Sequence, residues 1–429
     1  MIMNHYVTED TKAIILLCGV FGNDRSVKPL SQAEYSSLVR WLIAQKLRPS
    51  DLLQKEHIVE ASHSLGLESN RLESLIARGG SLGFAIEEWQ RSGIWIISRS
   101  DEDYPCRLKR HLKDKAPPLL YGAGDPRLLK GGGVAIVGSR NVDQQGEEFT
   151  RKVAELCVMN QLPVVSGGAR GVDQISMSAA LEAGGVTIGI VADDLLKKSV
   201  ARNSRYAIAE ERLLLISPYH PSARFAVGTA MARNKLIYAM ADYGLVVSAD
   251  HKKGGTWAGA EEELKRKNSK PIFVRIGEGT PIGNNKLLGL GAVPWPEVID
   301  REGLEQQLKN SVKQSPNPQN QKDPTLFDYQ MGASSQEISE KQSVSEPIDQ
   351  SSPARETHAE SQNPPGLNSI YEAVLPVILE NIKKPTTPED LAKALDVNKT
   401  QLNTWLQKAM DDKKVVKMSR PVRYRRRSV

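Results

Sequence analysis

Six short aliphatic runs, each followed by a segment of helical character, constrain the fold of this chain more than any other feature. They are Val134 to Val137, Leu162 to Val165, Val186 to Val191, Leu213 to Ile216, Leu245 to Val247 and Ile272 to Val274. Four of the runs are closed directly by glycine or serine, at Gly138, Ser166, Ser217 and Ser248. This alternation of strand and helix is typical of a doubly wound parallel sheet. We therefore predict an α/β fold for the central part of the chain.

The composition sets the class of protein. A chain of 429 residues with 40% apolar and 25% charged residues is expected to form several domains and to be neither a membrane protein nor wholly disordered. Its three cysteines, Cys18, Cys106 and Cys157, form no C-x-x-C pair, so no metal site and no disulfide framework is predicted. We expect a cytoplasmic protein with no signal peptide and no membrane partner.

Composition also divides the chain into four segments. Residues 1–115 show helical apolar spacing, and residues 116–313 carry the strand and helix alternation. Residues 314–369 are rich in Ser, Gln and Pro, with eight acidic against three basic residues, and are predicted to be a disordered acidic linker. Residues 370–429 regain aliphatic periodicity and carry thirteen basic against seven acidic residues. This excess of basic residues is compatible with a polyanionic partner, most of all at the C-terminal end.

The loops after the predicted strands are where ligands bind in an open parallel sheet. The first strand runs into Gly138, Ser139 and Arg140. The glycine allows the backbone to approach a phosphate, and the free N–H groups and the guanidinium favour an anion. The second runs into Ser166, Gly167, Gly168, Arg170 and Gly171. A tight turn with an exposed arginine explains the first loop equally well, but two such loops on adjacent strands predict a two-part anion cradle.

This cradle is not a known nucleotide fingerprint. The first strand is followed by no G-x-G-x-x-G, and the second ends in Ser166 where an acidic residue would bind a ribose. The chain also has no G-x-x-x-x-G-K-[ST] motif. We therefore expect neither a dinucleotide cofactor nor ATP hydrolysis, and we predict no cofactor.

Two further segments add basic residues. Lys252 and Lys253 precede Gly254 and Gly255, which suits a phosphate backbone, although a solvated loop is equally consistent. Phe225 precedes a helix that begins near Arg233, Asn234 and Lys235. Basic residues beside an aromatic ring are typical of single-strand binding, because the charges follow phosphates while the ring stacks on a base. Phe225 is alternatively a core residue.

These motifs together resemble the DNA-processing protein A (DprA, or Smf) family of bacteria. The resemblance begins at Glu88 to Ile97, continues through Asp103-Tyr104-Pro105 and Pro117 to Tyr121, and includes Val134 to Arg140, Ser166 to Asp173 and Arg233-Asn234 with Ile237. It covers about residues 88–277. The chain departs from the family pattern at Met177, at Arg224 to Gly228 and at Gly255 to Gly259, which indicates a divergent member.

The resemblance implies an extended Rossmann-like domain that binds single-stranded DNA in a basic pocket without breaking a bond. It also implies a homodimer and the loading of a RecA-type recombinase in DNA uptake, recombination or defence. The positions it favours are Gly138 to Arg140, Gly167 to Gly171 and Arg233 to Lys235. The same resemblance places a variable helical domain before the Rossmann-like part.

The C-terminal segment predicts a winged helix. Thr386 to Leu395 reads as a capped helix, Lys399 to Met410 as a second helix, and Val415 to Lys417 with Val422 to Arg425 as a two-stranded wing. Lys399, Gln401, Arg423 and Arg425 are its candidate contacts to duplex DNA. Winged helices also bind proteins, and this alternative stays open.

Two alternative functions use the same cradle. The first is a nucleotide phosphoribohydrolase-like enzyme, because Gly254 to Trp257 followed by Glu261 weakly resembles the P-G-G-x-G-T-x-x-E loop of that group. In that case Glu261 would stabilise a ribosyl cation or activate water. The second alternative is a sensor that binds a nucleotide and turns nothing over.

Overall fold

The computed structural model describes residues 6–22, 27–296, 303–314 and 370–426, apart from 383–384, 396–398, 413 and 419–422. The chain separates into two compact units, Met1–Ser334 and Ser335–Val429. The predicted acidic linker falls almost entirely outside the described residues. Within the described part of the chain, no helix is long and apolar enough to cross a membrane.

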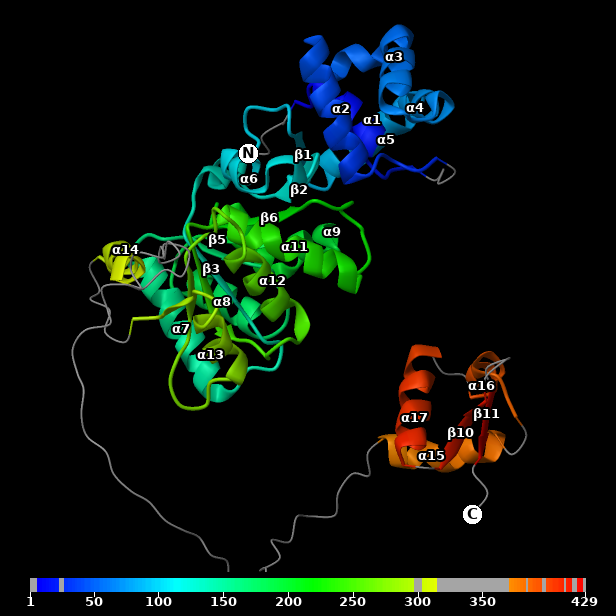
Figure 1. The fold of residues 1–429 in the computed structure, drawn as a ribbon, viewed down its shortest axis with the longest axis vertical. Helices are drawn as coiled ribbons and strands as arrows, with labels where there is room; N and C mark the ends of the chain where they lie inside the picture. The colour runs from blue at the N-terminus through cyan, green and yellow to red at the C-terminus, as the bar shows by residue number, and fades with distance from the viewer. Residues whose placement is uncertain are drawn as a thin grey trace, which may run out of the picture. The chain divides into compact units, whose positions relative to one another are not determined.

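One mixed sheet is the centre of the first unit (Figure 1). Its order in space is β1-β2-β6-β5-β4-β3-β7-β8-β9. The pairs β1–β2 and β2–β6 are antiparallel, and the other neighbours are parallel. The strands are β1 (Trp95–Ser98), β2 (Leu119–Ala123), β3 (Val134–Gly138), β4 (Val164–Ser166), β5 (Thr187–Ile190), β6 (Leu213–Ser217), β7 (Tyr243–Ser248), β8 (Ile272–Val274) and β9 (Val293–Pro294). All six predicted runs form strands, β3 to β8.

Alternate residues of β3 divide the core into two layers. Ala135 and Val137 share a buried cluster with α6 (Cys106–Leu112), α11 (Val227–Met240), α12 (Gly254–Leu264) and α13 (Ile282–Leu288). Val134 and Ile136 share another with α7 (Gln144–Met159), α8 (Val172–Glu182) and α14 (Leu304–Gln314). Helices thus cover both faces of a largely parallel sheet, and the predicted α/β architecture is confirmed.

The strand order creates a switch point beside β3. Strands β4, β5 and β6 lie on one side of β3, whereas β7, β8 and β9 lie on the other. The loops that follow β3 and β7 therefore leave the same edge of the sheet towards opposite faces. A crevice forms at this edge, and it is where ligands bind in open α/β sheets.

Helices α1 to α5 form most of the N-terminal region. They are α1 (Glu9–Cys18), α2 (Gln32–Gln45), α3 (Lys55–Leu65), α4 (Ser69–Ile76) and α5 (Gly79–Arg91), with a 3₁₀ turn η1 (Pro49–Leu53). Helix α1 is buried on two sides: Leu17 packs with α2, α3 and α4, whereas Ile14 and Ile15 pack towards α5 and β1. The remaining elements of this unit are η2 (Lys113–Lys115), η3 (Pro126–Lys130), α9 (Leu195–Val200) and α10 (Arg202–Ala209).

The prediction of helices throughout residues 1–115 is wrong at Trp95–Ser98. These four residues are all buried and form β1, which pairs antiparallel with β2. The indole of Trp95 covers Gly122, where an added Cβ would lie 2.2 Å from ring carbons. The aromatic and β-branched side chains of this apolar run suit a buried strand, and the helical spacing of the preceding residues does not extend into it.

The second unit contains three helices and a hairpin. They are α15 (Ile370–Asn381), α16 (Pro388–Ala394) and α17 (Lys399–Asp411), followed by the antiparallel strands β10 (Val415–Met418) and β11 (Arg423–Arg426). Ile378, Leu402 and Leu406 are fully buried in the core between these elements. Tyr424 joins the hairpin to this core, and its backbone pairs with Thr386 before α16.

An ion pair fixes the start of α2 against α4. Glu34 completes a capping box with Ser31 at the N-terminus of α2, and its carboxylate also accepts hydrogen bonds from Arg71 at 2.7 and 3.2 Å. The Arg71 guanidinium lowers the pKa of Glu34 from an ordinary 4.5 to about 2. A carboxyl whose pKa is lower in the folded state stabilises the fold above its unfolded pKa, and this contribution is lost as the pH falls.

We predict that Glu34→Gln lowers the free energy of unfolding by about 1–2 kcal/mol at pH 7, because a charged hydrogen bond is lost. The difference from the unmutated chain should shrink as the pH falls from about 4.5 towards 2, since Glu34 is then protonated in the unfolded state. Urea unfolding across this pH range measures it. Glu88→Gln, at an exposed carboxylate of α5, is the control and should show no such trend. An equal loss at every pH would contradict the role of the ion pair.

Candidate nucleic-acid interface

A cavity of about 390 Å³ lies at the switch point, between the ends of β3 and β7 and the first turns of α8 and α12. Helix α11 forms its third side. We call this cavity the cradle. Its lining residues are Val137, Gly138, Ser139, Arg140, Ala169, Asp173, Val227, Ala230, Met231, Arg233, Asn234, Tyr238, Ser248, Ala249, Asp250, Lys253, Gly254, Gly255 and Thr256. The two predicted glycine-rich loops and the predicted basic loop therefore meet at one site.

The loops after β3 and β4 touch each other through glycine. Gly171 has a φ of +83°, and an added Cβ would lie 2.4 Å from the Ser139 carbonyl oxygen and 2.7 Å from that of Arg140. The following N–H, of Val172, donates to the Ser139 carbonyl at 3.3 Å. A side chain at position 171 would force the loops apart, so glycine is required there for close approach.

Asp173 holds the same loops together from beneath. Its side chain is 6% exposed, and it accepts hydrogen bonds from the backbone N–H groups of Ala169, Gly167 and Gly138. Burial raises the pKa of Asp173, and the Arg233 charge and these three N–H groups oppose that rise. The carboxylate therefore organises the loops, and its charge is offset by these three N–H groups and by Arg233.

Arg233 forms the floor of the cradle. It is 5% exposed, and its Nη1 donates to the Ile190 carbonyl at 2.8 Å. Its guanidinium lies against Gly167, where an added Cβ would be 1.5 Å from Nη1. Burial lowers the pKa of Arg233, but a guanidinium remains charged in a protein. Arg233 therefore supplies positive potential from below and a fixed shape to the floor.

Two side-chain hydrogen bonds join the third loop to the others. Asn234 donates from Nδ2 to the Gly255 carbonyl at 2.9 Å, and Thr256 donates from Oγ1 to the Gly138 carbonyl at 3.0 Å. Helix α12 begins at Gly254, and the preceding Lys253 provides no side-chain cap for its first N–H groups. These N–H groups and the helix dipole favour a negative charge at this wall of the cradle.

The rim combines a cation with an exposed ring. The Arg140 guanidinium carbon lies 5.5 Å from the centre of the Phe225 ring, which is 51% exposed. Val227 and Met231 next to it are 66% and 46% exposed. The ring is therefore a surface group rather than the core residue that was the alternative prediction.

Several predicted residues lie outside the cradle lining. Ser166 is buried, and its Oγ donates to the Ile136 carbonyl at 2.7 Å, so it joins two strands. Lys235 faces Glu262, Lys115 and Arg266, and burial lowers its pKa. Four further predicted residues flank the site without lining it: Gly167, Gly168, Arg170 and Lys252. The Arg170 side chain hydrogen-bonds to Asn141. Lys252 is exposed, with a φ of 57°.

The sequence interpretation missed Thr256 and Tyr238. Thr256 stands inside a glycine-rich segment that was recognised, but nothing in the pattern indicates that its hydroxyl reaches Gly138. Tyr238 is 2% exposed, and its buried hydroxyl has no hydrogen-bond partner in the described structure. In the sequence pattern, the position of Tyr238 in the middle of α11 indicates only a core residue.

Glu261, the residue on which the enzyme alternative depends, is held elsewhere. Its carboxylate accepts hydrogen bonds from the Trp257 indole at 3.0 Å and from Lys265 at 2.8 Å. It is not among the residues that line the cradle. A carboxylate held in this way does not face a ligand in the cavity.

In the second unit, the four predicted contacts occupy one helix and one strand. Helix α17 begins at Lys399 and includes Gln401. The side chains of both residues lie outside the described part of the structure. Arg423 and Arg425 are exposed on β11, on either side of the buried Tyr424. The two arginines therefore project from the face of the hairpin that is opposite the core.

Comparison with known proteins agrees on one family. The family model described as DNA recombination-mediator protein A matches residues 95–298. Protein Smf of Synechocystis sp. is 30% identical over 266 residues, covering 57% of this chain and 65% of the relative. The DNA processing protein DprA of Streptococcus pneumoniae is 35% identical over 198 residues, covering 45% of this chain and 67% of the relative. The matches thus span about two thirds of these relatives' length.

A solved structure shows the same fold. The X-ray structure of DprA from Streptococcus pneumoniae superposes with a TM-score of 0.53 at 24% identity. The match covers 67% of this chain and 94% of that chain. The likeness therefore extends over nearly all of the solved chain.

We predict that Gly167→Ala displaces the Arg233 guanidinium and lowers the free energy of unfolding by about 1–3 kcal/mol, the usual cost of overpacking a filled site. The added methyl group occupies the position of Nη1 and breaks its bond to Ile190. Thermal unfolding measures this change. Gly83→Ala is the matched control, because an added Cβ on α5 meets nothing within 4 Å. Equal stability of the two variants would contradict the packing described for Arg233.

Proposed function

The chain belongs to the DNA recombination-mediator protein A family, and on this premise we propose that its cradle binds single-stranded DNA without cleaving it. The observation that carries the proposal is the convergence of two glycine loops, Arg140, Arg233 and Lys253 on one cavity. Backbone N–H groups and guanidinium groups there suit phosphates, and the exposed Phe225 ring suits a base.

The charges at the cradle support an anionic ligand. Arg140, Arg233 and Lys253 line it together with Asp173 and Asp250, and Asp173 is occupied by three N–H groups. Arg170 and Lys252 add positive charge close to the rim. A single strand is favoured over a duplex because the exposed Phe225 ring needs an unpaired base on which to stack.

The placement of Glu261 does not support the hydrolase alternative, since its carboxylate is bonded to Trp257 and Lys265. A nucleotide sensor remains the second candidate, because a single nucleotide would use the same N–H groups and cations. Binding of an oligonucleotide much more tightly than of a mononucleotide distinguishes the strand-binding function from the sensor.

The wider roles are proposals that rest on family membership. We propose that the protein acts as a homodimer in the cytoplasm and loads a RecA-type recombinase onto the bound strand during DNA uptake, recombination or defence. We further propose that residues 116–313 form the DNA-binding domain and that residues 370–429 form a winged helix, joined to it through residues 314–369. The tethered second unit then adds avidity through its effective concentration.

We predict that Arg140→Ala with Arg170→Ala weakens binding of a fluorescent oligothymidine at least tenfold near physiological salt and reduces the salt slope of log K by about 1.4, because two phosphate contacts are lost. Fluorescence anisotropy across a salt series measures both. The matched control is Lys152→Ala with Lys267→Ala, two exposed cations on α7 and beyond α12. If both double variants bind like the unmutated chain, the cradle is not the binding site.

We predict that Arg423→Ala with Arg425→Ala weakens duplex binding while single-strand binding changes little. The reason is that these exposed arginines extend from β11, in a unit separate from the cradle. Competition between a labelled duplex and a labelled single strand of the same sequence measures the two affinities. Unchanged duplex affinity would favour the alternative in which the winged helix binds protein.

A further inference from the structure

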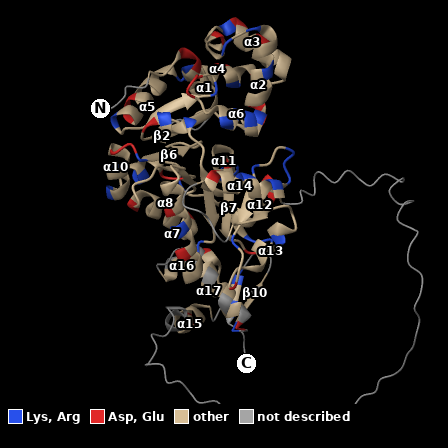
Figure 2. Cartoon of the chain, turned by 90° about the vertical axis from the view of Figure 1, so that its left-hand side faces the viewer, with Lys and Arg blue, Asp and Glu red and all other residues tan. Residues whose placement is uncertain are grey.

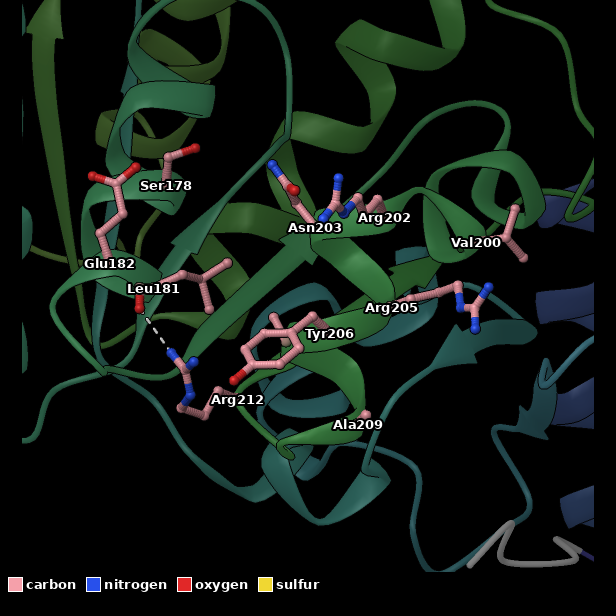
Figure 3. Close-up of a pocket in the computed structure, with 11 residues that line it drawn as sticks. Ser178, Leu181, Glu182, Val200, Arg202, Asn203, Arg205, Tyr206, Ala209 and Arg212 are labelled. Carbon is pink, nitrogen blue, oxygen red and sulfur yellow. Dashed lines mark hydrogen bonds between the residues drawn. The ribbon is translucent and has the colours of Figure 1, made fainter.

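A second cavity, of about 930 Å³, lies between the C-terminal half of α8 and helix α10. We call it the α10 groove. It is lined by Ser178, Leu181, Glu182, Val200, Arg202, Asn203, Arg205, Tyr206, Ala207, Ala209 and Arg212 (Figure 3). None of these residues belongs to the cradle, and nothing in the function proposed above uses them.

The groove carries an excess of accessible positive charge. Arg202 and Arg205 are exposed, and neither has an ion-pair partner among the described residues. Arg212 is partly neutralised by Glu210 and donates to the Leu181 carbonyl at 2.7 Å, which fixes it against α8. Glu182 faces Arg151 at 3.5 Å. Basic and acidic positions stand side by side around α10 in Figure 2, but among the described arginines of the groove only Arg202 and Arg205 lack a compensating acid.

The two arginines lie where they do not help α10 to fold. They fall in its first four residues, with no acidic residue in the first turn and no side-chain cap from Ala201. Cations near a helix N-terminus are unfavourable, because the dipole is positive there. Anionic groups bound in the groove would offset this unfavourable effect at each arginine.

An aromatic ring shares the groove with the arginines. Tyr206 is 66% exposed, and its hydroxyl hydrogen-bonds to Glu210, which holds the ring beside Arg212. In Figure 3 the ring lies between the labelled α8 residues and the rest of α10, with Arg202 and Asn203 above it, Arg205 extending away to its right and Arg212 below it. The cations are thus spread along the groove and do not converge on one point. This arrangement fits an extended polyanion with bases better than a compact phosphate.

Helix α8 connects the groove to the cradle. Asp173 at its N-terminal end lines the cradle, whereas Ser178 and Glu182 in its C-terminal half line the groove. At 1.5 Å per residue, these positions are separated by roughly 8–14 Å along the helix. This spacing along α8 is comparable to the length of a few nucleotides.

We propose that the α10 groove is a second contact for single-stranded nucleic acid, which binds the part of a strand that extends beyond the cradle. Arg202 and Arg205 neutralise phosphates, and the Tyr206 ring stacks on a base. This inference rests on the proposed function of the cradle. It adds a site that a long strand uses and a short strand does not.

The test compares a short oligothymidine of about eight nucleotides with a long one of about thirty. These lengths are chosen because a single OB fold, a common single-strand-binding domain, covers about 4–16 nucleotides. Arg202→Ala with Arg205→Ala should leave binding of the short strand within about twofold. It should weaken binding of the long strand about tenfold near physiological salt and lower its salt slope by about 1.4. The full chain is used, and Lys152→Ala with Lys267→Ala is the matched control for net charge.

A second pair of variants tests the ring. Tyr206→Ala should weaken binding of the long strand about fivefold or more, whereas Tyr206→Phe, which keeps the ring and loses only the bond to Glu210, should bind within about twofold of the unmutated chain. Thermal unfolding of each variant identifies any loss that comes from misfolding. Equal losses for Tyr206→Ala and Tyr206→Phe would show that the ring does not stack, and would overturn this part of the proposal.

The outcomes separate the two proposals. If the unmutated chain does not bind the short strand, the function proposed for the cradle fails, and the groove proposal fails with it. If the short strand binds but the long strand is unaffected by the groove variants, only the groove proposal is overturned. If the lysine control weakens binding of the long strand as much as the arginine variant does, the effect comes from net charge alone, and the groove proposal is overturned. If the arginine variant weakens binding of a labelled mononucleotide but not of the long strand, the groove is a small-ligand site and the strand contact is overturned.

Discussion

The buried carboxylate of Asp173 is the interaction on which the rest of the site depends. It accepts N–H groups from two loops that follow different strands, and it faces the Arg233 charge across Gly167. Removing a buried group that satisfies several donors leaves those donors unpaired, at a cost of about 1–3 kcal/mol each. The cradle is therefore built around a polar centre that belongs to the protein itself, and its shape exists before any ligand arrives.

The division of labour among the basic residues follows from this centre. Arg233 is buried and fixed, so it contributes a constant positive potential and little adaptability. Arg140 and Lys253 lie at the surface of the same cavity, where they can follow a flexible chain of phosphates. A rigid floor with an adaptable rim suits binding that depends on the backbone of a strand rather than on the identity of its bases.

Much of this architecture is predictable from the sequence, and the failures have physical causes. Strands β3 to β8 are short continuous aliphatic runs, and the loops after β3 and β4 carry the glycines that close approach requires, so both are recognisable. Strand β1 is missed because its apolar run directly follows a region of helical spacing and stands outside the strand and helix alternation of β3 to β8. Arg233, Asn234 and Lys235 are consecutive on a helix, where successive side chains point about 100° apart, so they cannot all face one cavity. The burial of Arg233 and the hydroxyl of Thr256 depend on tertiary contacts that no local pattern records.

The edges of the sheet restrict how two copies of this chain can associate. One edge is β1, four residues long, whose buried side chains pack against α1 and α5. The other is β9, two residues long and ending in Pro294, which has no N–H to offer a neighbouring strand. Short or proline-blocked edges oppose the continuation of a sheet from one molecule into the next. A homodimer of the kind proposed above would therefore use helices and loops, and the strands of each sheet would remain within one molecule.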